Sequence, residues 1–207
     1  MSQPPAQTAP RRGRPPAATR EQVLENATRR YLRGQRVDVQ SIAADLGLGR
    51  TTIYRWFGSR EGLIGDVLVG VTKPLLAEAR RGAHGRGAEK LLNTFDRFNR
   101  SLVDAPALQR FVEQERDAAV RIITSGAGNV QPRNVAMITE VIEDEVDAGR
   151  YAPPVEPETL GYAIVRLAEA FLFNETADAM RDSVDRLRDV EAALLGIRPK
   201  RRTSASS

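Results

Sequence analysis

The chain of 207 residues contains no cysteine and a single histidine. The absence of cysteine excludes disulfides, thiolate metal ligands and cysteine nucleophiles. His84 lies in RRGAHGRG, which we expect to be a loop, so a solvated side chain is favoured over a zinc ligand or a Ser-His-Asp triad member. No GxxxxGK[S/T] phosphate loop is present, and no GxGxxG follows a strand. We therefore expect no metal, no cofactor and no enzymatic activity.

Long hydrophobic runs are also missing. No apolar segment approaches the roughly 18 residues that a membrane span needs. The arginines near the N-terminus have no apolar stretch behind them, unlike a secretory signal. With 41% hydrophobic and 28% charged residues, the composition is that of a soluble globular protein. We expect a cytoplasmic protein with no membrane partner.

Lysine is absent from residues 1–60, which carry 11 arginines against 4 acidic residues. Residues 61–197 carry 16 basic and 23 acidic side chains, and the last ten residues add 4 basic ones. A basic head attracts a polyanion, whereas an acidic body is repelled by one. The distribution therefore favours a nucleic acid partner. Cationic ends that only aid solubility are the alternative.

Helical periodicity predicts an all-α fold of about nine helices. Residues 1–18 and 198–207 are expected to be a disordered basic arm and a disordered basic tail. The N-terminal helices are expected from Thr19 to Gly34, from Asp38 to Leu46 and from Arg50 to Phe57. Six further helices are expected near 59–81, 88–104, 106–124, 132–148, 157–175 and 180–195.

The second and third helices are joined by GLG and predict a helix-turn-helix over about residues 38–57. Such a unit places its second helix in the major groove of DNA. Ile53 and Phe57 lie four residues apart and should face the core. The side chains expected in the groove or at its walls are Arg50, Thr51, Tyr54 and Arg55. An ordinary helical hairpin with a partly buried Trp56 is the alternative.

Residues 19–64 resemble the TetR-type transcriptional regulators, through VDVQSIAADLGLGRTTIYRWFGSREGLI. This segment has the family's glycine turn, Thr-Ile-Tyr, an aromatic pair and Ser-Arg-Glu-x-Leu. The resemblance implies a three-helix DNA-binding domain over 19–64. It also implies that Arg50 reads bases, with help from Thr51 and Arg55. Arginine suits this role because its planar fork binds guanine O6 and N7 together.

Further contacts with double-stranded DNA are implied by the same resemblance. Positions that mostly contact phosphate in the family are matched by Thr52, Tyr54, Trp56 and Arg60. Positions in the second helix that meet the DNA backbone, or occasionally a base, are matched by Gln40 and Ser41. Family members often carry histidine where this chain has Trp56, which is larger and only a donor, so this contact is expected to be shifted or lost.

The arginines of the N-terminal arm lie in RRGRPP, which resembles an AT-hook core. A narrow A·T minor groove concentrates negative potential and attracts inserted arginine. Minor-groove contacts are therefore expected from Arg11, Arg12 and Arg14. An AT-hook normally has proline where Arg11 stands, and a merely basic leader is the alternative.

Residues 65–197 are expected to form a helical ligand-binding and dimerisation domain. The last two helices are apolar on several sides, so each must be covered on several sides. A second copy of the chain would supply that cover, and TetR-type proteins usually dimerise through their last two helices. The side chains expected at this homodimer interface are Leu160, Ile164, Leu167, Phe171, Val184, Leu187, Val190 and Leu194.

The resemblance also implies a small-molecule site among the fifth to eighth helices, where a ligand shifts the fourth helix. We expect a small apolar or amphipathic effector. The candidate lining side chains, each also explicable as ordinary core or interface, are Phe95, Phe98, Phe111, Tyr162, Arg166, Glu169 and Phe173. The segment TLGYAIVRLAEAFLF is similar to a subgroup associated with lactone signals.

Together these features predict a ligand-responsive homodimeric repressor that occupies a palindromic operator in double-stranded DNA. Three alternatives remain open from the sequence. They are a transcriptional activator, an architectural DNA-binding protein without a ligand, and a helical adaptor whose helix-turn-helix is only scaffold.

Overall fold

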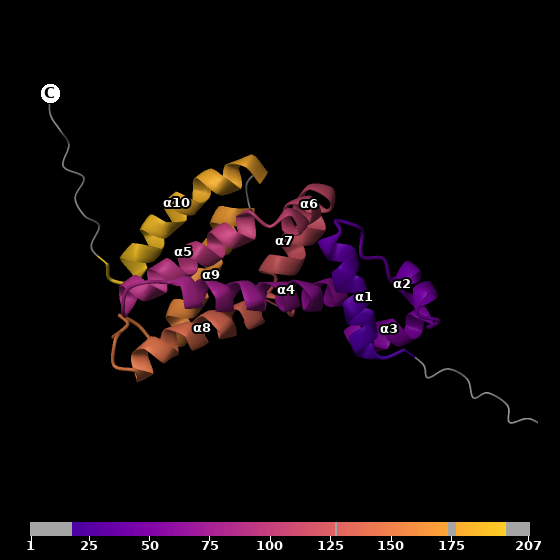
Figure 1. The fold of residues 1–207 in the computed structure, drawn as a ribbon, viewed down its shortest axis with the longest axis horizontal. Helices are drawn as coiled ribbons and strands as arrows, with labels where there is room; N and C mark the ends of the chain where they lie inside the picture. The colour runs from indigo at the N-terminus through magenta and orange to yellow at the C-terminus, as the bar shows by residue number, and fades with distance from the viewer. Residues whose placement is uncertain (1–17, 127, 174–176, 198–207) are drawn as a thin grey trace, which may run out of the picture.

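The computed structural model describes residues 18–126, 128–173 and 177–197. This part of the chain contains ten α-helices and no strand, which confirms the all-α prediction (Figure 1). The helices are α1 (Arg20–Leu32), α2 (Val39–Asp45), α3 (Arg50–Phe57), α4 (Arg60–Gly82), α5 (Ala88–Val103), α6 (Pro106–Gln114), α7 (Arg116–Thr124), α8 (Gln131–Asp147), α9 (Pro157–Phe173) and α10 (Ala177–Leu194).

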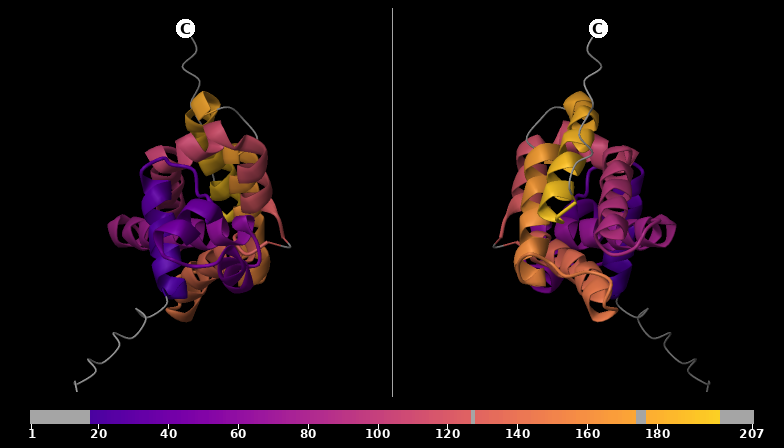
Figure 2. Two further views of the ribbon diagram at one scale, coloured as in Figure 1. Left: turned by 90° about the vertical axis from the view of Figure 1, so that its right-hand side faces the viewer. Right: turned by 90° about the vertical axis from the view of Figure 1, so that its left-hand side faces the viewer.

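The molecule is elongated, and α1, α2 and α3 lie together at one end (Figure 1). Helix α4 runs from this end along most of the remaining length, beside α5 and α8. Viewed from the α1–α3 end, the other helices stack behind these three (Figure 2). Across the described ranges, none of the helices has the length and apolarity that crossing a membrane requires.

The N-terminal helices begin and end where their capping residues predict. Thr19 Oγ1 accepts from the Gln22 N–H while the Gln22 side chain accepts from the Thr19 N–H, a reciprocal capping box. Asp38 caps α2, and Ser59 caps α4. Gly58 has a φ of 73° at the end of α3, a conformation that glycine adopts at little cost.

The segment 106–124 differs from the prediction of one helix. It forms α6 and α7, which meet at Glu115 with φ −136° and ψ 47°. No glycine or proline lies near this position, so local sequence does not signal a break. The Glu115 carboxylate is instead held by Arg60 from the start of α4, a tertiary contact that periodicity alone cannot predict.

The hydrophobic core joins the N-terminal helices to the rest of the chain. Val23, Ile42, Ile53 and Leu63 are all buried in one cluster that continues into α6, α7, α9 and α10. A second cluster lies among α4, α5, α8, α9 and α10. The first turns of α4 therefore pack on both the helix-turn-helix and the C-terminal helices.

Part of the predicted dimer face is buried inside one subunit. Leu160, Ile164, Val184 and Leu187 are fully covered by their own chain, because α9 packs between α8 and α10 and α10 packs on α5. The prediction that a second copy must cover these four side chains is therefore wrong. The remaining candidates are less buried: Val190 is 37% exposed, while Leu167, Phe171 and Leu194 are partly exposed.

Candidate nucleic-acid interface and ligand cavity

Helix α3 presents a polar and basic face to solvent. Ile53 and Phe57 are buried and anchor it on α1 and α4. The outward side chains are Arg50, Thr51, Tyr54 and Arg55, all exposed. This is the division of faces that the helical spacing predicts. It leaves two guanidinium forks and one phenol available to base edges and phosphates.

The other predicted DNA contacts lie around this face. Gln40 is exposed, and Thr52 and Trp56 are half-buried, with Trp56 packed against the core. Ser41 is also half-buried, and its hydroxyl donates to Asp38 Oδ2 at 2.8 Å. The Ser41 N–H at that carboxylate lowers the pKa of Asp38. The predicted arm contacts Arg11, Arg12 and Arg14 lie outside the described residues.

Arg60, predicted to contact phosphate, bonds to protein groups in this structure. Its Nη1 and Nη2 donate to the two carboxylate oxygens of Glu115, each at 2.7 Å, and its Nε donates to the Val37 carbonyl at 2.7 Å. The side chains of Arg60 and Glu115 are only 18% and 16% exposed. All three guanidinium nitrogens therefore bond within the protein, and the phosphate contact stays a prediction.

The Arg60–Glu115 pair joins three parts of the chain. It ties the start of α4 to the α1–α2 connection and to the junction of α6 and α7. The hydrogen bonds from Arg60 lower the pKa of Glu115. Arg36 approaches the same carboxylate, with its Nε 3.8 Å from Oε1. A bidentate pair of this kind holds the two side chains in one relative orientation and also adds interaction energy.

Asp66 forms a second junction on α4, one turn and a half further along. Its Oδ2 accepts from Arg20 at the start of α1, and its Oδ1 accepts from Arg133 Nη1 at 2.7 Å on α8. Asn129 Nδ2 donates to the same Oδ1 at 2.9 Å. Arg20 also lies over the Phe57 ring, 4.5 Å from its centroid. Helix α1, whose Arg20 lies over Phe57 of α3, is thus linked to α8 through one buried carboxylate.

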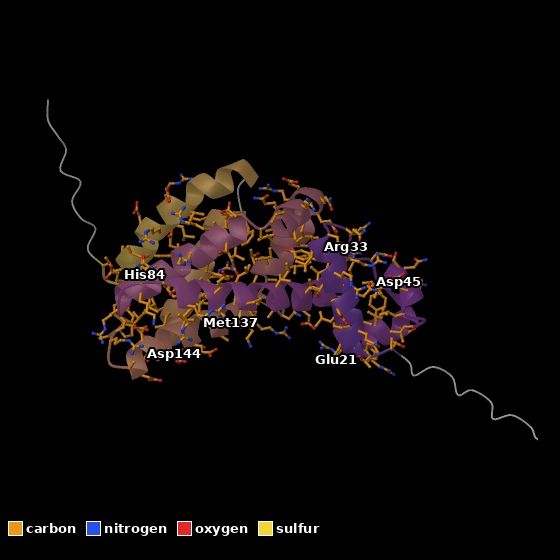
Figure 3. The ribbon with its side chains drawn as sticks, in the orientation of Figure 1. Glu21, Arg33, Asp45, His84, Met137 and Asp144 are labelled. Atoms are coloured by element: carbon orange, nitrogen blue, oxygen red, sulfur yellow. The ribbon has the colours of Figure 1, made fainter. Side chains whose placement is uncertain are left out.

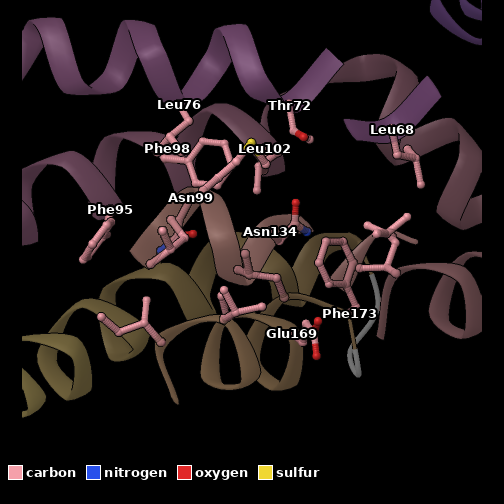
Figure 4. A pocket seen from close by; sticks show the side chains of 18 of the residues that line it. Leu68, Thr72, Leu76, Phe95, Phe98, Asn99, Leu102, Asn134, Glu169 and Phe173 are labelled. Atoms are coloured by element: carbon pink, nitrogen blue, oxygen red, sulfur yellow. The ribbon is translucent and has the colours of Figure 1, made fainter. Parts of the chain in front are cut away.

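An apolar cavity lies among the C-terminal helices (Figure 4). Its volume is about 70 Å³, in a measure where one water molecule needs about 10–15 Å³. Helices α4, α5, α8, α9 and α10 supply most of the wall. The lining residues are Leu68, Thr72, Leu76, Phe95, Phe98, Asn99, Leu102, Leu108, Ile123, Val130, Asn134, Met137, Ile138, Ile164, Val165, Ala168, Glu169, Leu172, Phe173 and Glu191.

Four of the seven candidate ligand residues line this cavity: Phe95, Phe98, Glu169 and Phe173. The other three do not. Phe111 is buried in the N-terminal core, with its ring edge-on to Tyr31 at 6.0 Å. Tyr162 is 51% exposed, because it lies on the solvent side of α9. Arg166 is exposed and donates to Glu169 Oε2 at 2.7 Å and to the Thr124 carbonyl.

Polar lining residues were missed by the sequence reasoning. Asn99 Nδ2 donates to Glu191 Oε1 at 3.1 Å, and Asn134 faces the same cavity. Burial raises the pKa of Glu191 to about 8 and also raises the pKa of Glu169. One signal was available for Glu191. It stands four residues from both Leu187 and Leu195 in the inward stripe of α10, a position where a carboxylate is unexpected.

The single histidine lies far from the helix-turn-helix. His84 lies in the α4–α5 connection, exposed, at the end of the molecule opposite Asp45 and α2 (Figure 3). The loop predicted there is confirmed.

The family model described as "Tetracyclin repressor-like, C-terminal domain" matches residues 86–196, more than half of the chain. The chain belongs to the TetR family of transcriptional regulators. This match covers the C-terminal helices, whereas the motifs GLGRTTIYRWF and SREGL lie in the N-terminal ones. No curated protein sequence matches this TetR-family chain.

Solved structures agree with the family assignment. The transcriptional repressor QsdR of R. erythropolis, a TetR-family protein, is 28% identical, with a TM-score of 0.79 over 87% of this chain and 96% of that one. The TetR-family repressor AlkX of Dietzia sp. strain DQ12-45-1b is 22% identical, with a TM-score of 0.55 over 86% of this chain and 96% of that one. The second likeness shows the shared fold alone.

Proposed function

We propose that this TetR-family chain is a ligand-responsive repressor that binds a near-palindromic DNA operator as a homodimer and is released by a small molecule. The observation that carries the proposal is the outward face of α3, where Arg50, Thr51, Tyr54 and Arg55 are exposed at one end of the molecule. The similarity to QsdR, described as a transcriptional repressor, supports repression rather than activation.

The proposed division of labour places DNA binding in residues 19–64 and ligand binding with dimerisation in residues 65–197. Helix α4 spans both parts. At its start, Arg60 donates to Glu115 and the Gly62 carbonyl accepts from Asn129. Further along the same helix, Leu68, Thr72 and Leu76 line the cavity. A ligand that displaces α4 would therefore move α3, and the coupling free energy between such sites is typically about 1–3 kcal/mol.

Arg50→Ala is expected to weaken operator binding by about 1–3 kcal/mol and to relax the preference at one base pair of each half-site. The physical reason is the loss of a bidentate donor to a base edge. Titration of labelled operator variants measures both effects. Glu25→Ala, on the exposed side of α1, is the control and should leave affinity and preference unchanged. If Arg50→Ala bound all operator variants as the parent does, the prediction that α3 lies in the major groove would be wrong.

Selection of bound DNA from a random pool tests the function as a whole. Two recognition helices related by two-fold symmetry should recover an inverted repeat with half-site centres about 34 Å apart. Recovery of no common sequence would favour an architectural DNA-binding protein, and recovery of no DNA would favour a helical adaptor. Reporter expression with the selected site in the promoter then separates repressor from activator.

The dimer face is proposed to be the solvent side of α9 and α10, around Tyr162 and Val190, which are 51% and 37% exposed. Tyrosine is enriched at subunit interfaces, and both side chains lie on the last two helices, through which TetR-type proteins usually dimerise. Tyr162→Asp is expected to shift the sedimentation coefficient from dimer towards monomer. Val155→Asp, at a similarly exposed residue between α8 and α9, is the matched control. A Tyr162→Asp protein that still sediments as a dimer would place the interface elsewhere.

A further inference from the structure

The cavity contains most of the unpartnered buried polar atoms in the described part of the chain. Buried side-chain atoms without a hydrogen-bond partner there are Asn134 Oδ1, Thr139 Oγ1, Glu169 Oε1 and Glu191 Oε2. Three of these four belong to residues that line the cavity. Buried polar groups nearly always have partners, so their gathering in one place indicates a site built to receive hydrogen bonds.

Both carboxyl groups are deeply buried. Glu169 is 5% exposed and Glu191 is 0% exposed. In each residue one oxygen is engaged by the protein: Glu169 Oε2 by Arg166 and Glu191 Oε1 by Asn99. The other oxygen of each has no hydrogen-bond partner within the described chain, although the Gln131 side chain also acts on Glu169. Figure 4 shows Asn99, Asn134 and Glu169 at separate positions among the apolar side chains.

The charge of the cavity wall restricts what can enter. Its lining residues within the described chain include two glutamates and no lysine, arginine or histidine. An anionic ligand would be buried beside carboxyl groups with no cation in the lining, which opposes its binding. A cationic ligand gains little, because Arg166 already balances Glu169 and burial favours the uncharged form of Glu191.

We propose that the cavity selects a small, uncharged, mainly apolar molecule that carries a hydrogen-bond donor, such as a primary amide or an alcohol, and rejects the matching carboxylate. The donor bonds to Asn134 Oδ1, and the oxygen of the amide or alcohol accepts from the Glu191 carboxyl group. The alkyl part contacts Phe95, Phe98 and Phe173.

The small volume agrees with a short chain. A cavity of about 70 Å³ holds about five to seven water-sized groups in the measure used above. Hexanamide, hexanoate, hexylamine and heptane, with about seven or eight non-hydrogen atoms, form a matched set close to this size. Their ends are neutral polar, anionic, cationic and apolar. Each is titrated into the full chain, without DNA, by calorimetry and by thermal melting at neutral pH.

Hexanamide is expected to bind at least about tenfold more tightly than each of the other three, the factor that one unsatisfied buried hydrogen-bonding group produces. Asn134→Leu should lower the affinity for hexanamide about tenfold and leave heptane unaffected. Glu143→Gln, on the exposed side of the same helix and outside the lining, should leave this selectivity unchanged. A merely structural role for Asn134 would change both ligands alike.

Tighter binding of hexanoate or hexylamine, equal binding of heptane, or no binding of hexanamide at millimolar concentration would each overturn the proposal. The inference rests on the proposed function, because the cavity is taken as the effector site. The two fail separately: selection of DNA from a random pool tests operator binding without any ligand. A protein that recovers an inverted repeat but does not bind hexanamide would refute only the class of ligand.

Discussion

Arg60→Ala is expected to lower the free energy of unfolding by about 2–4 kcal/mol, because it leaves a largely buried carboxylate without its partner. The substitution removes two hydrogen bonds to Glu115 and one to the Val37 carbonyl, each 2.7 Å long. The salt dependence of DNA binding is expected to stay the same, because all three guanidinium nitrogens of Arg60 bond within the protein. Denaturant unfolding and operator titrations at several salt concentrations measure the two quantities.

The matched control is Arg55→Ala, at an exposed arginine on α3. This variant should retain stability and reduce the slope of log affinity against log salt by about one unit if Arg55 contacts a phosphate. Arg60→Lys should recover only part of the stability, since an ammonium group cannot form the bidentate pair. If Arg60→Ala were fully stable and reduced the salt slope, Arg60 would bind DNA in solution.

Glu191 is expected to make the protein less stable as the pH rises towards 8. Burial raises the pKa of its carboxyl group to about 8, whereas the unfolded chain has an ordinary value of about 4.3. The folded state therefore keeps a proton that the unfolded state has released. Its stabilising effect is complete below the unfolded value and is lost as the pH rises through the folded one, at up to about 1.4 kcal/mol per pH unit.

Glu191→Gln is expected to remove this dependence, because an amide has the same shape and carries no proton to release. The variant and the parent should be about equally stable near pH 5, and the variant should be more stable by on the order of 3 kcal/mol near pH 8. The charges of Asp96 on α5 and Arg188 on α10 also affect the pKa of Glu191, so neither residue is substituted in this experiment. Glu143→Gln, on the exposed side of α8, is the control. Parallel pH profiles for parent and Glu191→Gln would show that Glu191 is ionised when buried.

The opposite dependence is expected at low pH from Glu145. Hydrogen bonds led by those from Arg150 lower its pKa to about 2. Stability from this group is present above the unfolded value and is lost as the pH falls towards 2. Unfolding measurements across the acid range should therefore show a loss of stability as the pH falls, and this loss should be the same in the parent and in Glu191→Gln.

The local features of this protein were determined by its sequence. Thr19, Asp38 and Ser59 cap their helices through side-chain oxygens, and Gly58 ends α3 in a conformation that suits glycine. The spacing of Ile53 and Phe57 decided which face of α3 is buried. These outcomes follow from interactions between residues at most a few positions apart, so a single sequence contains all that they need.

Only the tertiary structure decided which partners the charged and polar side chains found. Arg60 bonds to Glu115, 55 residues away, and Asn99 bonds to Glu191, 92 residues away. The break between α6 and α7 and the coverage of Leu160 and Leu187 within one subunit have the same origin. Helical periodicity shows that a side chain points inward, but the partner it meets there depends on how distant helices pack, and packing is a property of the whole chain.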